Sequence, residues 1–269
     1  MDIIEVTDIK ELAELFISME NHWAYRGQLD STWKIEPGIA RVVEPGFSSS
    51  TLYQTEKNLK HMFESSARHY AVAEELPTTD FAWLSLMQHY GAPTRLLDLT
   101  TSPFTALFFA MDGAIPDDGK KSSIFCVDYR ALNQRSLEML QQNEMEFDWD
   151  YRKFQLSPDE FFSEYVYKKV ASTLWIMEPA LKNVRIMKQG GTFLVKGDIS
   201  QSTESLINQN YSQIPMKNIL IGHDLLTESF DMLSKCGISY QGIYPGLEGL
   251  AKDIKLTLLQ SYRKASRKN

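Results

Sequence analysis

The stretch TRLLDLTTSPFTALFFAMDG, residues 94–113, constrains the fold of this 269-residue chain more than any other segment. Its opening residues, TRLLDLT, are too short and too apolar a run for a surface helix, so they predict a buried strand. Ser102 follows where the N-cap of a helix belongs, Pro103 occupies the first helical position, and Gly113 comes just after the last apolar turn. A strand that leads straight into an apolar helix predicts a sheet with helices packed on it.

The rest of the chain mixes helical and extended segments in the same way. Apolar residues at helical spacing predict helices over about residues 9–17 and 50–70, and a capped helix is predicted over about 79–90. HWAYRGQ, SSIFCVDY and YQGIY predict short strands, and RIMKQGGTFLVKG predicts a hairpin or a strand. No internal repeat and no long linker divides the sequence. We therefore predict one α+β domain over residues 1–269, with a mixed β-sheet wrapped by helices.

Composition is that of an ordinary globular protein and argues against a nucleic-acid-binding domain. Hydrophobic residues make up 43% of the chain and charged residues 23%, and the formal net charge is −7. The exception is the basic tail SYRKASRKN, residues 261–269. Such a tail is typical of a solvated helix end, where cations suit the helix dipole, and it is the one segment suited to contact RNA or an acidic partner.

The sequence predicts a soluble, cytoplasmic protein. Cys126 and Cys236 lie far apart and show no metal-ligand spacing, which favours a reducing compartment. The chain opens on the acidic, amphipathic MDIIEVTDIKEL rather than on a signal peptide. No apolar run approaches the roughly 20 residues that a membrane span needs.

Several familiar catalytic motifs are absent from the sequence. It has no glycine-rich phosphate loop, no GxGxxG after a strand, no GxSxG and no HExxH. The five histidines include no pair with convincing metal spacing and a nearby third ligand. We therefore expect no metal cofactor.

Polar side chains that suit ligand binding fall in three places, each beside a segment that must be buried. The first is YRGQ, whose arginine is costly to bury unless a carboxylate or a phosphate meets it. The second is QHYGAPTRLLDLTTSP, around the predicted strand and the start of the helix that follows it. The third lies late in the chain and contains Gln189 and Glu248. The candidate binding residues are Tyr25, Arg26, Gly27, Gln28, Tyr90, Arg95, Asp98, Thr100, Thr101 and Ser102, and the candidate catalytic residues are His89, Gln189 and Glu248.

Each of these residues also has a purely structural explanation. Arg26 and Arg95 would pair with Asp98 and Glu248 inside the fold, since buried charges come in pairs. His89, at the end of a helix, is favoured there by the helix dipole. As a group, however, they predict a nucleotide pocket, because the N-terminus of the following helix is suited to an anion. We predict that Arg26, His89, Arg95 and Asp98 converge on one cleft.

Four sequence blocks resemble the FRG domain family. They are YRGQ, QHYGAPTRLLDLTTSPFTALFFA, RIMKQGGTFLV and GIYPGLEGLAKDI, and they occur in the order seen in that family. The family is named for an aromatic–Arg–Gly signature, which Tyr25, Arg26 and Gly27 supply here. The resemblance spans residues 23 to about 254, nearly the whole chain.

The sequence also resembles ADP-ribosyltransferases, and this second resemblance implies an ADP-ribosyltransferase-like fold and a reaction that uses NAD. Many of these enzymes also begin with an aromatic–Arg–Gly strand, whose arginine holds the phosphates of NAD. They continue with a strand, a serine or threonine and a helix, to which LLDLTTSPFTALFFA is similar. Their third motif is a late glutamate or glutamine, for which Glu248 and Gln189 are candidates. We favour Glu248, because a carboxylate stabilises positive charge better than an amide does.

The resemblance therefore implies an enzyme that uses NAD. The planar fork of Arg26 suits a pyrophosphate, and Tyr25 or Tyr90 would stack on a ring. A carboxylate near the ribose would stabilise an oxocarbenium-like transition state. We expect transfer of ADP-ribose to a macromolecule, or hydrolysis of NAD, in a toxin or a phage-defence effector. The alternative is a non-enzymatic nucleotide- or protein-binding module that uses the same arginine-lined pocket.

Overall fold

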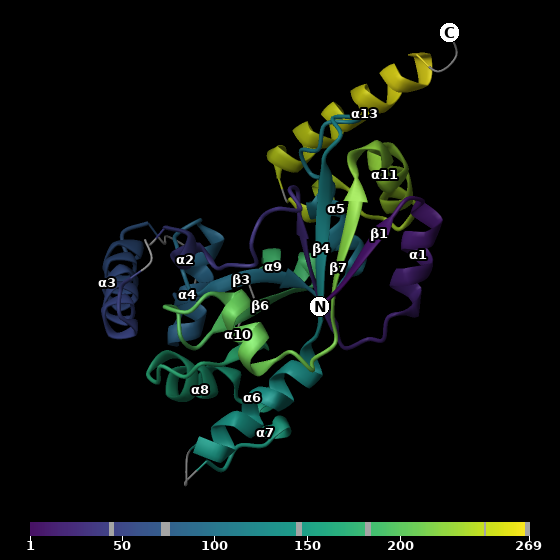
Figure 1. The fold of residues 1–269 in the computed structure, drawn as a ribbon. Helices are drawn as coiled ribbons and strands as arrows, with labels where there is room; N and C mark the ends of the chain where they lie inside the picture. Colours follow the sequence, from purple (N-terminus) through teal and green to yellow (C-terminus); the bar gives the residue numbers. More distant parts are fainter. Residues whose placement is uncertain (43–45, 71–75, 144–146, 181–183, 245, 267–269) are drawn as a thin grey trace.

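A seven-stranded mixed sheet forms the centre of the protein, which a computed structural model describes over residues 1–42, 46–70, 76–143, 147–180, 184–244 and 246–266 (Figure 1). The strand order is β1-β7-β4-β2-β3-β6-β5. β1 runs parallel to β7, and the other neighbouring strands are antiparallel. The strands are β1 Asp2–Val6, β2 Trp23–Gln28, β3 Leu96–Thr100, β4 Lys121–Asp128, β5 Leu174–Met177, β6 Gly191–Lys196 and β7 Met216–Gly222.

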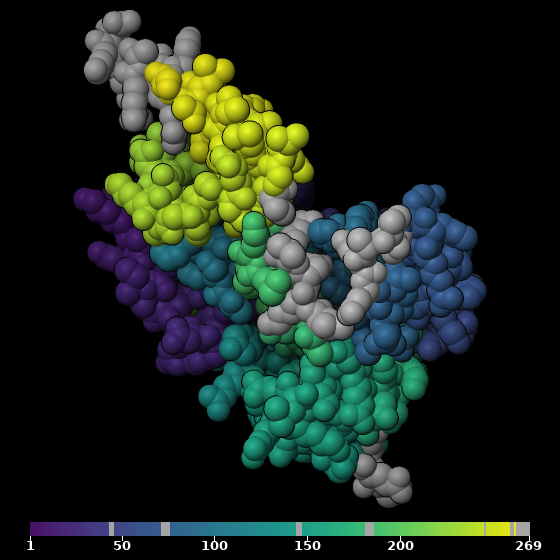
Figure 2. Space-filling view, turned by 180° about the vertical axis from the view of Figure 1, so that it is seen from behind, coloured from purple at the N-terminus to yellow at the C-terminus, as the bar shows by residue number. Residues whose placement is uncertain are grey.

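Helices surround this sheet, which confirms the predicted α+β class (Figure 1). The N-terminal segment and the segment that contains α3 (Ser49–Ala67) lie on opposite sides of the molecule, and α13 (Leu247–Ser266) projects from one end (Figure 2). The end of the basic tail, residues 267–269, lies outside the described residues. The other helices are α1 Ile9–Ser18, α2 Gly38–Val42, α4 Asp80–His89, α5 Pro103–Met111, α6 Tyr129–Asn143, α7 Tyr151–Leu156, α8 Pro158–Phe161, the π-helix η1 Phe162–Tyr167, α9 Val184–Gln189, α10 Thr203–Asn210, the 3-10 helix η2 His223–Leu225, α11 Leu226–Lys235 and α12 Tyr240–Ile243.

Three hydrophobic clusters pack against the sheet. One covers β2, β4 and β7 and includes side chains of α1, α5, α11 and α12. A second lies on the same face over β3, β5 and β6, with side chains of α4, α6 and η1. The third covers the opposite face from β4 to β5, with side chains of α6 and α10. The first two clusters therefore meet at the junction of β2 and β3.

The sheet is nearly open at that junction. β2 pairs with β4 at six positions and β3 pairs with β6 at five, but β2 and β3 are paired only through Tyr25 and Thr100. Because side chains alternate along a strand, those two residues point to the face of the first two clusters, while Arg26 and Gln28 point to the opposite face. The two strands separate beyond this single pair.

Gly27 allows α5 to lie directly against β2. A Cβ atom at this position would lie 1.9 Å from the backbone oxygen of Ala106 and 2.5 Å from the backbone nitrogen of Ala110, both in α5. No side chain fits into so close an approach. The glycine of YRGQ is therefore required by packing.

Side chains, rather than a further strand, complete the outer edge of β5. Asn133 of α6 donates from Nδ2 to the carbonyl oxygen of Ile176 at 2.7 Å, and its Oδ1 accepts from the backbone nitrogen of Ile176 at 2.8 Å. Ser136 donates to the carbonyl oxygen of Leu174 at 2.5 Å, and the hydroxyl of Tyr211 accepts from the nitrogen of Leu174 at 2.8 Å. Polar backbone groups that an edge strand exposes are satisfied here by side chains.

The local signals around α5 are confirmed, whereas several other elements differ from the sequence prediction. Ser102 caps α5 by accepting from the backbone nitrogen of Thr105, and Pro103 is its first residue. β1, β5 and β7 are not predicted from the sequence. YQGIY, predicted as a strand, contains helix α12, because Ser239 caps it by accepting from the nitrogen of Gly242. Within the described part of the chain, no helix has the length and apolar character needed to span a bilayer.

Gly27→Ala is expected to destabilise the fold by about 3 kcal/mol or more, at the upper end of the cost of overpacking, because the new methyl group overlaps backbone atoms of α5. Urea unfolding followed by circular dichroism measures this loss. Gly38→Ala is the matched control, since its Cβ would lie 3.4 Å from the nearest atom, and it should change stability by less than about 1 kcal/mol. Equal losses in the two variants would contradict the packing argument.

Candidate functional site

A cavity of about 330 Å³, which we call the Arg26 cavity, opens where β2 and β3 separate. Phe109 and Tyr244, which pack against the cluster on one face of the sheet, line it together with Leu99 from the cluster on the opposite face. The cavity therefore reaches both faces through the open junction. The predicted site residues that line it are Tyr25, Arg26, Gly27, Gln28, Asp98, Thr100 and Gln189.

Arg26 bridges the open junction between the two strands. Its Nη1 donates to the backbone carbonyl oxygen of Asp98 at 2.6 Å, so the contact is with the main chain of β3 and not the predicted pairing with the carboxylate. Its Nε is buried and has no hydrogen-bond partner among the residues described. Burial lowers the pKa of the guanidinium, the charge of Asp98 raises it, and the charge of Arg41 lowers it. An anion in the cavity would supply the missing partner.

A short series of hydrogen bonds orients the Asp98 side chain. Gln88 donates from Nε2 to Asp98 Oδ2 at 2.8 Å, and Thr94 donates from Oγ1 to Gln88 Oε1 at 2.8 Å. Asp98 is exposed to solvent, unlike its neighbours in β3. The carboxylate is therefore held in place and remains accessible to a ligand.

The two candidates for the third motif lie in very different places. Gln189 is 9% exposed, lines the Arg26 cavity and donates from Nε2 to the carbonyl oxygen of Ile243 at 3.2 Å, while Thr100 donates to its backbone oxygen at 2.6 Å. The Glu248 side chain is 69% exposed, does not line the cavity, and lies 3.5 Å from Lys252. The structure therefore places Glu248 outside the Arg26 cavity, because the first turn of α13 keeps this carboxylate on the surface, and the identity of the third-motif residue stays a prediction.

Asp112 is a second carboxylate in the Arg26 cavity, and sequence reasoning missed it. Tyr240 donates to its Oδ1 at 3.0 Å and Tyr244 donates to its Oδ2 at 2.8 Å, with Lys252 Nζ 3.4 Å from Oδ2. An acid at the C-terminal end of a helix, as Asp112 is in α5, opposes the helix dipole, and that is the signal by which it could have been found. Its oxygens are already engaged by the protein.

Arg95 is not part of this cavity, which corrects the prediction that it converges with Arg26. It is 1% exposed and forms an ion pair with Glu56, with Nε donating to Glu56 Oε2 at 2.7 Å. Its Nη1 donates to the carbonyl oxygen of Val166 at 2.9 Å, and its guanidinium lies 5.1 Å from the ring centre of Tyr167. With its donors satisfied inside the fold, Arg95 joins α3, β3 and η1.

The remaining predicted residues are spread around the cavity rather than gathered in it. His89 lines a small adjoining pocket of about 20 Å³ together with Asp98 and Gln189. Tyr90 is 63% exposed and lies outside the Arg26 cavity, while the ring of Tyr25 is buried against α5, where burial raises its pKa. Of the two rings predicted to stack on a ligand, only that of Tyr25 belongs to a residue that lines the Arg26 cavity. Ser102 serves as the N-cap of α5, and Thr101 lines a different cavity.

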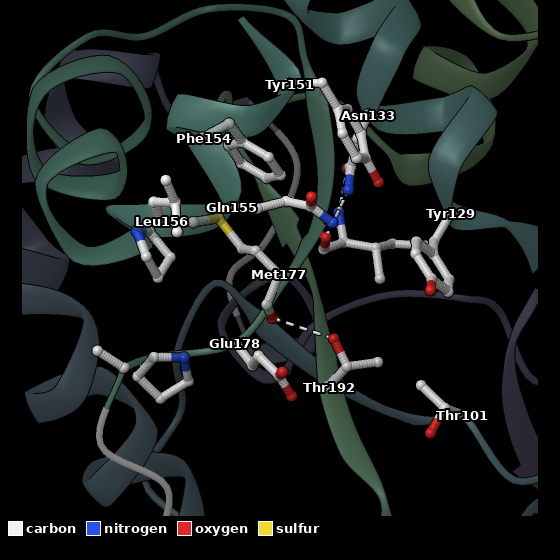
Figure 3. Close-up of a pocket in the computed structure, with 14 residues that line it drawn as sticks. Thr101, Tyr129, Asn133, Tyr151, Phe154, Gln155, Leu156, Met177, Glu178 and Thr192 are labelled. Carbon is white, nitrogen blue, oxygen red and sulfur yellow. Dashed lines mark hydrogen bonds between the residues drawn. The ribbon is translucent and has the colours of Figure 1, made fainter. Parts of the chain in front are cut away.

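That different cavity has a volume of about 340 Å³ and lies between β5, β6 and the helices α6 and α7 (Figure 3). Tyr129, Tyr151 and Phe154 form aromatic parts of its wall, and Thr192 donates to the carbonyl oxygen of Met177 at 3.2 Å within it. Thr101 is the one predicted site residue that lines it. The Arg26 cavity is the candidate site, because it gathers seven of the predicted residues and this one gathers a single residue.

Ser122, His223 and Asp118 are arranged like a catalytic triad at another place in the fold, but they do not form an active site. His223 Nε2 lies 3.0 Å from Ser122 Oγ and its Nδ1 lies 2.9 Å from Asp118 Oδ1. Ser122 is fully buried and donates to the carbonyl oxygen of Ala110 at 2.5 Å, so no substrate reaches it. Across the described ranges, no group of three or more His, Cys, Asp or Glu residues is placed to hold a metal ion.

Residues 21–119 match the family model of the FRG domain. The matched range contains Arg26, Asp98 and Asp112 of the cavity and ends before Gln189. The predicted extent of the resemblance, from residue 23 to about 254, remains a prediction beyond residue 119. Neither the curated proteins nor the solved structures contain a match to this chain.

Arg95→Ala is expected to lower the free energy of unfolding by about 3–5 kcal/mol, because it leaves the Glu56 carboxylate buried without its partner. Lys121→Ala is the control, since its ion pair with Glu5 is exposed on both sides and its loss should cost less than about 1 kcal/mol. Urea unfolding of both variants tests the difference. A stability of Arg95→Ala equal to that of Lys121→Ala would show that the buried pair does not hold the fold.

Proposed function

We propose that this chain, which carries an FRG domain, binds NAD in the Arg26 cavity and cleaves the bond between nicotinamide and ribose, passing ADP-ribose to a macromolecular acceptor or to water. The supporting observation is the buried Nε of Arg26, which lacks a partner among the described residues and belongs to a cavity that Asp98 and Gln189 also line. An arginine with an unused donor suits a phosphate oxygen. A carboxylate and an amide suit the hydroxyl groups of a ribose.

A second cation lies near Arg26. Arg41, on α2, lies close enough that its charge lowers the pKa of Arg26. The backbone nitrogen of Ile39 donates to the carbonyl oxygen of Thr94 at 3.1 Å, which fixes α2 beside the segment that leads into β3. Two cations near one another repel, so the charge of Arg41 favours an anion beside Arg26. Arg41 does not line the Arg26 cavity, so the proposed phosphate contact is that of Arg26.

The proposed reaction breaks the bond between C1′ of the ribose and the ring nitrogen of nicotinamide. The bonding electron pair leaves with nicotinamide, and positive charge develops on the ribose as in glycoside cleavage. The acceptor oxygen or nitrogen then bonds to C1′ and releases its proton to solvent. The role of the protein is to hold the two halves of NAD in position and to stabilise the developing charge.

Asp98 is the carboxylate best placed to stabilise that charge. Among the acids considered, Glu248 lies outside the cavity and Asp112 already accepts from two tyrosine hydroxyls. Asp98 is held by Gln88 alone in the described structure and keeps an oxygen free for the ribose. Gln189, anchored to Ile243 through Nε2, would present its Oε1 to a ribose hydroxyl.

Arg26→Ala is expected to weaken NAD binding by about 10- to 100-fold, the equivalent of a charge-assisted hydrogen bond worth about 1.5–3 kcal/mol. Isothermal titration calorimetry measures the affinity, and thermal unfolding measures the stability of the same sample. The variant should stay folded, because the Arg26 guanidinium is not the partner of a buried carboxylate. A large loss of stability with unchanged NAD affinity would contradict the proposal and favour a structural role.

Asp98→Asn keeps the shape of the side chain and removes its charge, so it should lower turnover at least about tenfold, or about 1.4 kcal/mol of barrier, with NAD affinity little changed. Nicotinamide release measures turnover. Glu248→Gln should stay within about twofold of the wild-type rate, since its carboxylate lies outside the cavity. Loss of turnover in Glu248→Gln alone would return the catalytic role to Glu248. Binding of NAD without nicotinamide release by the wild type would identify a non-enzymatic binding module.

A further inference from the structure

Trp33 is the one tryptophan whose ring is largely exposed. It is 55% exposed, whereas Trp23, Trp83, Trp149 and Trp175 are each 9% exposed or less. The loop that carries it is ordered by local hydrogen bonds: Asp30 Oδ1 accepts from the nitrogen and the hydroxyl of Thr32, at 2.9 and 2.6 Å, and the Trp33 nitrogen donates to the Asp30 carbonyl oxygen at 3.1 Å. Core packing does not account for a large ring held in this position.

The ring of Trp33 stands between two cavities. It lines the Arg26 cavity and also a second cavity of about 280 Å³, which we call the Tyr211 cavity. Among the described residues, Gln28 is the other one that lines both cavities, and its Nε2 donates to the Lys34 carbonyl oxygen at 3.4 Å, which ties the loop to the end of β2. The two cavities are therefore neighbouring chambers separated by a common wall.

The Tyr211 cavity is suited to bind a planar aromatic ring. Phe125 and Tyr211, both buried in the cluster on that face of the sheet, form its floor with Ile214. Asn208 and Asn218 add amide groups that can donate to and accept from the edge of a base. The rest of the lining includes charged residues, among them Lys34 and Glu204, so the chamber combines aromatic and apolar walls with polar groups, as small-molecule sites do.

We propose that Trp33 is the stacking residue of a two-chambered dinucleotide site, in which the Arg26 cavity holds the nicotinamide half of NAD and the Tyr211 cavity holds the adenosine half. This inference rests on the proposed function. The assignment of halves follows from the chemistry: Arg26, Asp98 and Gln189, which serve the phosphate and the reacting ribose, all line the first chamber. The half that does not react then occupies the second chamber, where the base stacks on the indole ring of Trp33.

Fluorescence provides a direct test, because Trp33 is the tryptophan that a collisional quencher such as acrylamide reaches. Titrating acrylamide into the wild type with and without saturating AMP or NAD measures the accessibility of Trp33. We expect each nucleotide to reduce the quenching constant about twofold or more. AMP should suffice, because it carries the adenosine half alone.

Binding variants complete the test by calorimetry. Trp33→Ala should lower NAD affinity about tenfold or more, and Trp33→Phe should stay within about threefold of the wild type because phenylalanine also stacks. Tyr70→Ala is the matched control: Tyr70 is another exposed aromatic residue, but it lines neither chamber, so NAD affinity should not change.

The outcomes separate this inference from the proposed function. Wild-type NAD affinity in Trp33→Ala, or unchanged quenching with AMP bound, overturns the two-chambered site while leaving the Arg26 cavity as the NAD site. Protection of Trp33 together with weakened binding in Trp33→Ala, but no nicotinamide release by the wild type, supports the two-chambered site and overturns the catalytic proposal. Absence of NAD binding and of protection in the wild type overturns both.

Discussion

The approach of α5 to β2 at Gly27 is the contact on which the geometry of the candidate site depends. β2 carries Arg26, and Asp112 is the C-cap residue of α5, so two charged groups of the cavity belong to these two elements or their ends. Because the backbones touch with no side chain between them, strand and helix hold a fixed spacing. A site whose charged groups are fixed before the ligand arrives needs little reorganisation during binding or reaction. Gly27 therefore affects the candidate site only by fixing the spacing between β2 and α5.

Two arginines in this fold solve the problem of a buried charge in opposite ways. Arg95 has a carboxylate, main-chain carbonyl oxygens and an aromatic ring around it, and its charge is satisfied by the protein. Arg26 bonds to one carbonyl oxygen and keeps a buried Nε without a partner in the described structure. The first arrangement stabilises the fold, and the second leaves binding free energy for a ligand. Both arginines stand next to apolar strand residues in the sequence. Their different roles therefore depend on which distant residues the fold places beside each guanidinium group.

Local sequence signals predicted the elements around the site. The contacts of the site residues depend on partners that are distant in the sequence, and these could not be predicted. The caps of α5 depend on neighbouring residues, so Ser102 and Pro103 could be assigned from the sequence alone. The partner of Arg95 could not, although Glu56 lies four residues after Leu52 on the buried side of α3, where an acid is unusual. Likewise Glu248 has the better chemistry for a third motif, but only the packing of the last helix determines that its carboxylate stays on the surface.

The closure of β5 by Asn133, Ser136 and Tyr211 has a consequence for how the sheet behaves toward other chains. The positions where an eighth strand would pair are occupied by an amide and two hydroxyls, so β5 cannot template the addition of a foreign strand. The two edges of the sheet therefore differ in how available they are for pairing with another strand. At the opposite margin, β1 pairs only with β7 and Ile3 is 69% exposed. Any growth of this sheet by strand exchange, in a misfolded or domain-swapped form, is directed to the N-terminal strand and away from the side of the molecule that carries β3 and β6.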